Sequence, residues 1–108
     1  MNNLIKQYLF DIEKSIEEIE IFMKGVNTFE EYEKNLLLKR AIEREIEIIG
    51  EAMNRILKID DSIKITNSRQ IVSTRNKIIH GYDDVDDLLI YGIIKKHIPS
   101  LKKEISKL

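Results

Sequence analysis

Three residue types that can act together on a phosphodiester lie within eight positions of this chain, namely Arg75, His80 and Tyr82. Arginine carries a permanent, planar charge that matches phosphate oxygens. Histidine can both accept and donate a proton near neutral pH. A tyrosine hydroxyl can hydrogen-bond or be modified. The set indicates phosphodiester chemistry carried out without a metal ion.

Cleavage of RNA without a metal needs few groups. A base removes the proton of a ribose 2′-hydroxyl, an acid protonates the leaving 5′-oxygen, and a cation stabilises the charge on the phosphorane. His80 suits the base or the acid, and Arg75 suits the phosphate clamp. Asn76 could hold the imidazole or donate to a phosphate oxygen. A 2′-hydroxyl nucleophile would restrict such an enzyme to RNA.

Helical geometry sets a condition on this site. Asn76 and His80 are four residues apart and share a helix face, and Arg75 aligns with Tyr82 if the helix persists that far. Arg75 and His80 lie about 140° apart at about 100° per residue, so one helix cannot easily turn both toward one small ligand. Either the helix unwinds at Gly81, or a second subunit completes the site in a two-fold dimer.

Each of these residues also has an ordinary structural interpretation. Arg75 could be solvated or salt-bridged, His80 could be a cation that meets the helix dipole, and Tyr82 could be half-buried packing. Short motifs have high false-positive rates. The octapeptide 75–82 alone therefore favours the structural interpretation.

The composition describes one folded domain. A chain of 108 residues is long enough for one core and too short for two, so residues 1–108 are expected to form a single domain. The net charge of −1 excludes bulk attraction of nucleic acid. The segment 62–82 nevertheless contains four basic residues and no acid, so we expect a local basic surface there.

Three features of the sequence restrict the cellular compartment and the kinds of site that the chain can form. The chain has no cysteine, which excludes disulfides and thiolate metal sites. Its first residues are too polar for a signal peptide. No apolar run approaches the roughly 20 residues that span a bilayer, so we expect a cytoplasmic protein without a membrane partner.

Apolar residues repeat at steps of three and four almost throughout, which predicts helices. One seam, 5–23, predicts a first helix. A second seam, 38–56, predicts a second long helix that opens at a capping box of Thr28 and Glu31 and has at most a kink near Asn35.

The rest of the chain predicts two more main helices. Asn67 with Gln70 resembles a capping box that starts a third helix, which ends at Gly81. Asp86 is expected to cap a last helix, which Pro99 should bend or restart. The predicted fold is an all-α, four-to-five-helix up-and-down bundle.

The second long helix could also contribute to a site. Arg44 and Glu51 are seven residues apart and lie on one face; such a pair is usually a surface feature, although it could line a cleft, as could Lys77. Gly50 costs a helix interior about 1 kcal/mol relative to alanine, so we expect a close helix–helix approach there. The acidic run 83–87 lacks the spacing of a calcium loop, and we predict no metal and no cofactor.

The motif Arg75-x-x-x-x-His80-x-Tyr82 resembles that of the HepT-like toxins of the HEPN superfamily. The resemblance covers nearly the whole chain. Residues 41–52 are similar to a second-helix pattern that ends in Ile-Gly-Glu-Ala, and residues 85–99 are similar to the C-terminal part of the family. Many relatives carry a Pro-Trp pair where this chain has Asn67-Ser68.

The resemblance implies a HEPN-like bundle that dimerises, so that two Arg–His motifs form one shared cleft. It implies a metal-independent endoribonuclease with Arg75 and His80 in the catalytic positions and Asn76 beside them. It also implies a toxin–antitoxin pair, in which a minimal nucleotidyltransferase antitoxin of the MNT type transfers AMP to Tyr82. An adenylate there would fill the cleft and neutralise its charge.

Two other functions compete with the ribonuclease toxin. The chain could be a non-catalytic helical subunit that binds a minimal nucleotidyltransferase or presents substrate to it, or a dimeric bundle whose motif is structural. The joint presence of Arg75, His80 and Tyr82 favours the toxin, because a pure scaffold does not need all three.

Overall fold

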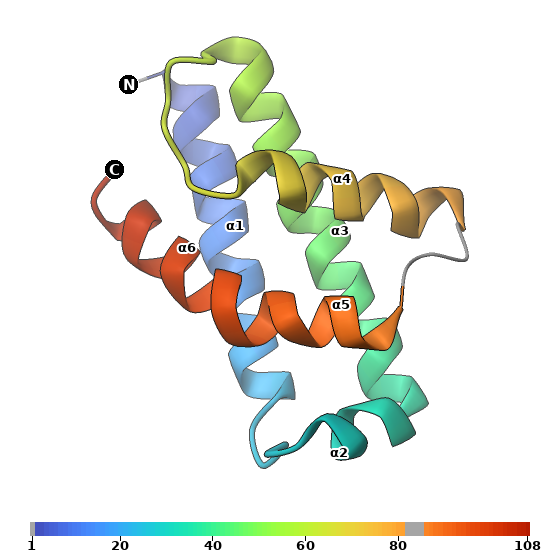
Figure 1. Ribbon diagram of the computed structural model, residues 1–108. Helices are drawn as coiled ribbons and strands as arrows, with labels where there is room; N and C mark the ends of the chain where they lie inside the picture. Colours follow the sequence, from blue (N-terminus) through green and yellow to red (C-terminus); the bar gives the residue numbers. More distant parts are fainter. Residues whose placement is uncertain (1, 82–85) are drawn as a thin grey trace.

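The computed structural model describes residues 2–81 and 86–108, which form helices joined by short connections (Figure 1). The helices are α1 (Asn3–Phe22), α2 (Phe29–Lys34), α3 (Leu36–Ile59), α4 (Ser68–His80), α5 (Asp87–Gly92), the π-helical segment η1 (Ile93–His97) and α6 (Ile98–Ser106). No strand occurs within these two ranges. The predicted all-α class is confirmed.

The two long helices, α1 and α3, lie side by side and form the centre of the molecule (Figure 1). Helix α4 packs on α3, and α6 packs on α1. Figure 1 shows that α4 and the C-terminal segment α5–α6 run across the α1–α3 pair, not along it. The crossing brings the motif helix against the middle of α3.

The core consists of apolar side chains from all the helices, and isoleucine dominates it. The buried members are Ile5, Leu9, Ile12, Ile16, Ile19 and Met23 around α1; Tyr32 of α2; Leu38, Ile42, Ile46, Ile49, Ala52, Met53 and Ile56 of α3; Ile65 of the loop before α4; Ile71 of α4; and Ile90, Ile93, Ile94, Ile98, Leu101 and Ile105 in the C-terminal segment. Isoleucine ordinarily favours strands. The spacing of three and four outweighs that preference because it places a continuous apolar stripe on each long helix.

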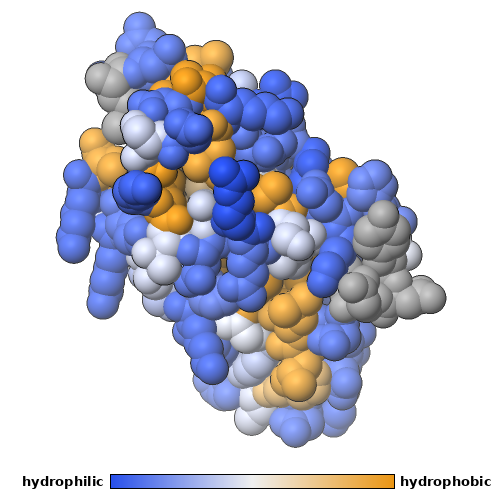
Figure 2. All heavy atoms as spheres, turned by 45° about the horizontal axis from the view of Figure 1, so that its top comes forward, coloured by the Kyte–Doolittle hydropathy of each residue, from blue (hydrophilic) through white to orange (hydrophobic). Residues whose placement is uncertain are grey.

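The outer surface is mostly hydrophilic. Figure 2 shows a tilted view of the face in Figure 1, on which charged and polar side chains are interrupted by smaller apolar patches. None of the helices in residues 2–81 and 86–108 combines the length and the apolar character that crossing a membrane requires.

The predicted second long helix is wrong at Asn35, where the chain divides into α2 and α3. Asn35 has an extended backbone, with φ −100° and ψ 93°, and its side-chain oxygen accepts a hydrogen bond from the Leu38 N–H at 3.0 Å. An asparagine side chain that bonds the backbone in this way starts a new helix. The predicted start at Thr28 is confirmed, since its hydroxyl accepts from the Glu31 N–H at 3.2 Å.

The capping box predicted at the start of α4 is also wrong, although the bounds of the helix are close to those expected. Asn67 adopts a left-handed backbone with φ 63°, and its side chain makes no capping hydrogen bond. The loop before it is held from the other end of the chain, because the Thr66 N–H donates to Glu104 of α6 at 2.9 Å. The end at Gly81 is as predicted, with φ 66°, which glycine adopts at little cost.

The C-terminal segment starts and bends as the sequence predicts. Asp86 caps α5 by accepting from the Leu89 N–H at 2.6 Å. Proline at position 99 lacks an N–H and crowds the preceding turn. The chain responds with the wider π turn of η1, closed by the Ile98 N–H and the Ile93 carbonyl, before α6 continues.

Glu45 is a buried carboxyl at the contact between α3 and α1. It is 4% exposed, and its Oε1 has no hydrogen-bond partner among the described residues. The pKa of Glu45 is raised to about 7, first by burial and then by the hydrogen bond and charge of Glu18, against the lowering effects of a hydrogen bond from Ser15 and the charge of Arg44. The ionised form is therefore disfavoured inside the fold.

Replacing Glu45 by glutamine should remove a pH-dependent cost. The pKa of Glu45 rises from 4.5 to about 7 on folding, so the folded state binds more protons between these values and its stability falls as pH rises through this window. Glu45→Gln should therefore be more stable than the parent at pH 8 by about 1–3 kcal/mol, and the gain should shrink at pH 5. Urea unfolding at both pH values measures the difference.

The exposed Glu17 of α1 supplies the control. Glu17→Gln should change the stability little at either pH. A Glu45→Gln variant with equal loss of stability at pH 5 and pH 8 would show that the carboxylate has an ionised role in the fold.

Candidate functional site

A groove of about 280 Å³ lies where α1, α3 and α4 meet. Helix α4 contributes Arg75 and Ile79, and α1 contributes Tyr8 and Asp11. Helix α3 contributes side chains from one face: Arg44, Glu47, Ile48, Glu51, Ala52 and Arg55. Their spacing of three and four along α3 places them in a row.

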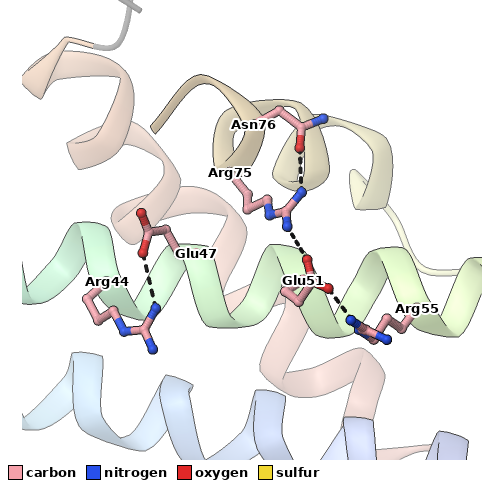
Figure 3. A network of polar contacts seen from close by, with 6 residues as sticks. All are labelled: Arg44, Glu47, Glu51, Arg55, Arg75 and Asn76. Carbon is pink, nitrogen blue, oxygen red and sulfur yellow. Dashed lines mark hydrogen bonds and ion pairs between the residues drawn. The ribbon is translucent and has the colours of Figure 1, made fainter. Parts of the chain in front are cut away.

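Arg75 is held from two helices. Its Nη1 donates to the Asn76 side-chain oxygen at 2.7 Å, and its Nη2 forms an ion pair with Glu51 of α3 (Figure 3). The Arg75 side chain is only 21% exposed. Because both terminal nitrogens are engaged by different neighbours, the orientation of the guanidinium plane in the groove is fixed.

Glu51 joins two arginines through its two oxygens. One oxygen meets Arg75, and the other accepts from the Arg55 Nε at 2.8 Å (Figure 3). The Arg55 side chain is 56% exposed. Its hydrogen bond to Glu51, and a second to Tyr8, raise the pKa of Arg55. One carboxylate therefore forms ion pairs with two permanent positive charges.

The close contact of α4 with α3 depends on Gly50, the residue before Glu51. A Cβ at Gly50 would overlap the Cβ of Arg75, and it would lie 2.9 Å from the Arg75 Cγ and 3.3 Å from the Ile71 carbonyl oxygen. The expected close helix–helix approach at Gly50 is confirmed. This close approach of the two helices brings the Arg75 side chain within reach of Glu51.

The structure places the other residues named from the sequence at different distances from this groove. Arg44 lines it and pairs with Glu47 at 3.3 Å. Lys77 is half-buried on α4, outside the groove lining. Tyr82 lies outside the described residues, as do Asp83 and Asp84 of the acidic run.

His80 is the last residue of α4 and is exposed. Among the described residues it is not one of those that line the groove around Arg75. Five helical residues separate His80 from Arg75, which corresponds to about 7.5 Å along the axis and about 140° around it. Asn76 shares the helix face of His80, but its amide oxygen binds Arg75. Within this chain, the Arg75 side chain therefore lines the groove and the His80 side chain does not.

The basic residues Lys64, Arg69 and Arg75 of the acid-free segment line two different hollows. Arg69 and Lys64 line a separate hollow near the start of α4, together with Asp61. Around Arg75 the missing acid is supplied by α3, through Glu51. The segment has an acidic partner that lies far away in sequence.

Arg55, Tyr8 and Asp11 are groove residues that the sequence analysis did not single out. Arg55 could have been found, because it lies four residues after Glu51 on the face that already carried Arg44. No signal in the sequence pointed to Tyr8 and Asp11, because their place depends on how α1 pairs with α3.

The two described aspartates of the acidic run 83–87 have structural roles. Asp86 caps α5, and Asp87 pairs with Lys39 of α3 at 3.1 Å. In residues 2–81 and 86–108, no group of three histidine, aspartate or glutamate side chains is arranged to hold a metal ion.

Comparison with known proteins places the chain in a family. The HepT-like ribonuclease family matches residues 12–108. A protein of Thermococcus cleftensis named "Probable ribonuclease HepT" is 36% identical over 106 residues, which are 95% of this chain and 94% of that protein. A protein of Methanocaldococcus jannaschii named as a "Putative RNase" is 34% identical over 103 residues, which are 94% of this chain and 93% of that one. No solved structure matches the chain.

The all-helical fold, the motif in residues 75–82 and the family match all point to the same family. This chain belongs to the HepT-like ribonuclease family, and the resemblance drawn from residues 41–52 and 75–82 is confirmed.

Replacing Gly50 by alanine should disturb the α3–α4 contact. The added methyl overlaps Arg75, so the helices must move apart or the side chain must shift. We expect Gly50→Ala to destabilise the fold by about 1–3 kcal/mol, as in other overpacked sites. Thermal or urea unfolding measures the change.

Gly92 provides a matched control, because it is also helical and a Cβ there would meet nothing within 4 Å. Gly92→Ala should stabilise the protein by about 0.5–1 kcal/mol through helix propensity. If both variants gained stability alike, the close approach at Gly50 would be disproved.

Proposed function

We propose that this protein is a ribonuclease toxin that cleaves RNA internally through the ribose 2′-hydroxyl. The observation that carries the proposal is the guanidinium of Arg75, fixed by Glu51 and Asn76 at a groove in a chain of the HepT-like ribonuclease family. A phosphate clamp must be oriented before substrate arrives, because preorganised charge is what stabilises a transition state.

In the proposed reaction Arg75 neutralises the non-bridging phosphate oxygens while negative charge builds up on phosphorus. A base removes the proton of the 2′-hydroxyl, whose oxygen attacks phosphorus, and the bond to the 5′-oxygen breaks. An acid protonates that leaving oxygen, and a 2′,3′-cyclic phosphate remains. His80 supplies the imidazole for one of the two proton transfers. These steps need side chains only.

We propose that the working site forms between two protomers. His80 lies on the exposed end of α4, outside the groove that holds Arg75. Its neighbour Ile79 is apolar and 47% exposed and lines that groove, so contact with a second subunit there would bury it. A two-fold axis near this end of α4 would bring the partner subunit's His80 toward the same RNA strand.

The proposal extends to regulation. A minimal nucleotidyltransferase of the MNT type would act as the antitoxin and transfer AMP to the hydroxyl of Tyr82, two residues beyond His80. The adenylate would place negative charge and bulk beside the arginine groove. This pairing is expected in the cytoplasm.

A non-catalytic subunit that binds such a nucleotidyltransferase is the second candidate. The observation in its favour is that the ion pair between Arg75 and Glu51 also joins α4 to α3, which is a structural role in itself. The activity of variants separates the two candidates.

His80→Ala should abolish the activity. We expect RNA cleavage by the purified protein to fall by about 100-fold or more, because a general acid or base typically contributes that much. Gel analysis of a labelled RNA measures the cleavage, and growth of host cells on induction provides a second readout. His97→Ala replaces the other histidine of the chain and should leave cleavage unchanged. Equal cleavage, or none, by the parent and His80→Ala would favour the non-catalytic subunit.

Co-expression with a nucleotidyltransferase encoded beside this gene tests the regulation. Intact-mass and peptide mass spectrometry should find AMP on Tyr82, and the modified protein should no longer cleave RNA. Tyr82→Phe should escape modification and stay active. AMP on another residue only would refute the assignment of Tyr82 and leave the nuclease proposal standing.

A further inference from the structure

We propose that Arg55 binds an RNA phosphate next to the one held by Arg75, so that α3 contributes directly to substrate binding. The inference rests on the proposed ribonuclease function and adds a substrate-binding residue to it. Arg55 lies outside the segment 75–82 and lines the groove from α3.

The shared contact with Glu51 places the two arginines close together in the groove. Both guanidinium groups contact the carboxylate of Glu51, each at a different oxygen (Figure 3). One carboxylate and the hydrogen bond on each side of it therefore separate the two guanidinium groups. A strand whose phosphate reaches Arg75 passes Arg55 at a neighbouring phosphate.

The charges around Glu51 leave Arg55 available. One carboxylate cannot neutralise two guanidinium groups, and the other glutamate on this face of α3, Glu47, is paired with Arg44. Asp11 lies across the groove on α1. An arriving phosphate supplies the charge that the Arg55–Glu51–Arg75 set lacks.

The contacts of the two arginines differ in the way that their proposed roles require. Glu51 and Asn76 hold both terminal nitrogens of Arg75, whose side chain is 21% exposed. Glu51 holds Arg55 at Nε, and that side chain is 56% exposed. A guanidinium has five N–H donors, so Arg55 can keep its hydrogen bonds to Glu51 and Tyr8 and still offer donors to a phosphate. Arg75 is oriented for chemistry, and Arg55 is accessible for binding.

The position of Arg55 is set by the long helix α3, which packs against the core. Glu51 and Arg55 are four residues apart on α3, the spacing at which a glutamate and an arginine pair along a helix. Helix α3 is buried through much of its length, and Gly50 brings α4 onto it at this level. The position of Arg55 relative to Arg75 is therefore set by the core.

RNA binding by Arg55→Gln tests the inference. A fluorescent single-stranded RNA of uniform length is titrated at several salt concentrations with proteins that carry His80→Ala, so that cleavage does not interfere. We expect Arg55→Gln to weaken binding about 10-fold at low salt. It should reduce the slope of log K against log salt by about 0.7, the value for one phosphate contact to a single strand. Arg55→Lys keeps the charge and should keep the slope.

Arg40 supplies the matched control. It lies on α3, is 64% exposed and pairs with Glu43 at 3.1 Å, much as Arg55 pairs with Glu51, but it is not among the residues that line the groove. Arg40→Gln should bind RNA within about twofold of the parent with the same slope. Circular dichroism confirms that each variant is folded.

Cleavage by the same substitutions with His80 intact completes the test. Arg55→Gln should raise KM with little change in kcat, because Arg55 binds ground state and transition state alike. A lower kcat with unchanged KM and salt slope would overturn the inference, since Arg55 would then act only through Glu51 and Arg75. Equal behaviour of Arg55→Gln and Arg40→Gln would overturn it as well, with the proposed function intact if the parent cleaves. A parent that neither binds nor cleaves RNA would refute both proposals.

Discussion

The contact between α3 and α4 is the constraint on which the rest of this structure depends. Gly50 has no side chain at the crossing, and the Cβ and Cγ of Arg75 fill the space that a side chain there would take. Glu51, one residue further on, then meets the Arg75 guanidinium. Two consecutive residues of α3 thus fix both the position of the motif helix and the direction of its arginine. A crossing made by larger side chains would keep the core and lose this alignment.

The fold explains why the groove is built on the central pair of helices. Helices α1 and α3 form the core, and their polar faces at one level carry Tyr8, Asp11 and the row from Arg44 to Arg55. Side chains on such a rigid base keep their geometry better than side chains on loops. His80, by contrast, ends its helix at an exposed turn. The groove is organised within one chain, whereas we propose that the imidazole reaches it from a second subunit.

Local pattern was enough to predict much of this molecule. The apolar seams gave α1 and most of α3, Gly81 gave the end of α4, and Asp86 gave the cap of α5. Asn35 was misjudged because one side-chain hydrogen bond outweighed a helical rhythm that continued past it. The partner of Arg75 could not be read from segment 62–82, because the pairing of Arg75 with Glu51 depends on how two helices cross. Dimerisation and the role of Tyr82 remain predictions, since no single chain tests the first and the second lies outside the described residues.

Gly50 also limits how this protein could be made more heat-resistant. Replacing helical glycines by alanine is a common route to stabilisation, because it restricts the unfolded chain and favours the helix. That route is open at Gly92, where the space around the backbone is empty. At Gly50 the same change would push away the helix that carries the arginine. Stability and the geometry of the groove therefore both require glycine at position 50, and an engineered thermostable form would have to keep it despite its poor helix propensity.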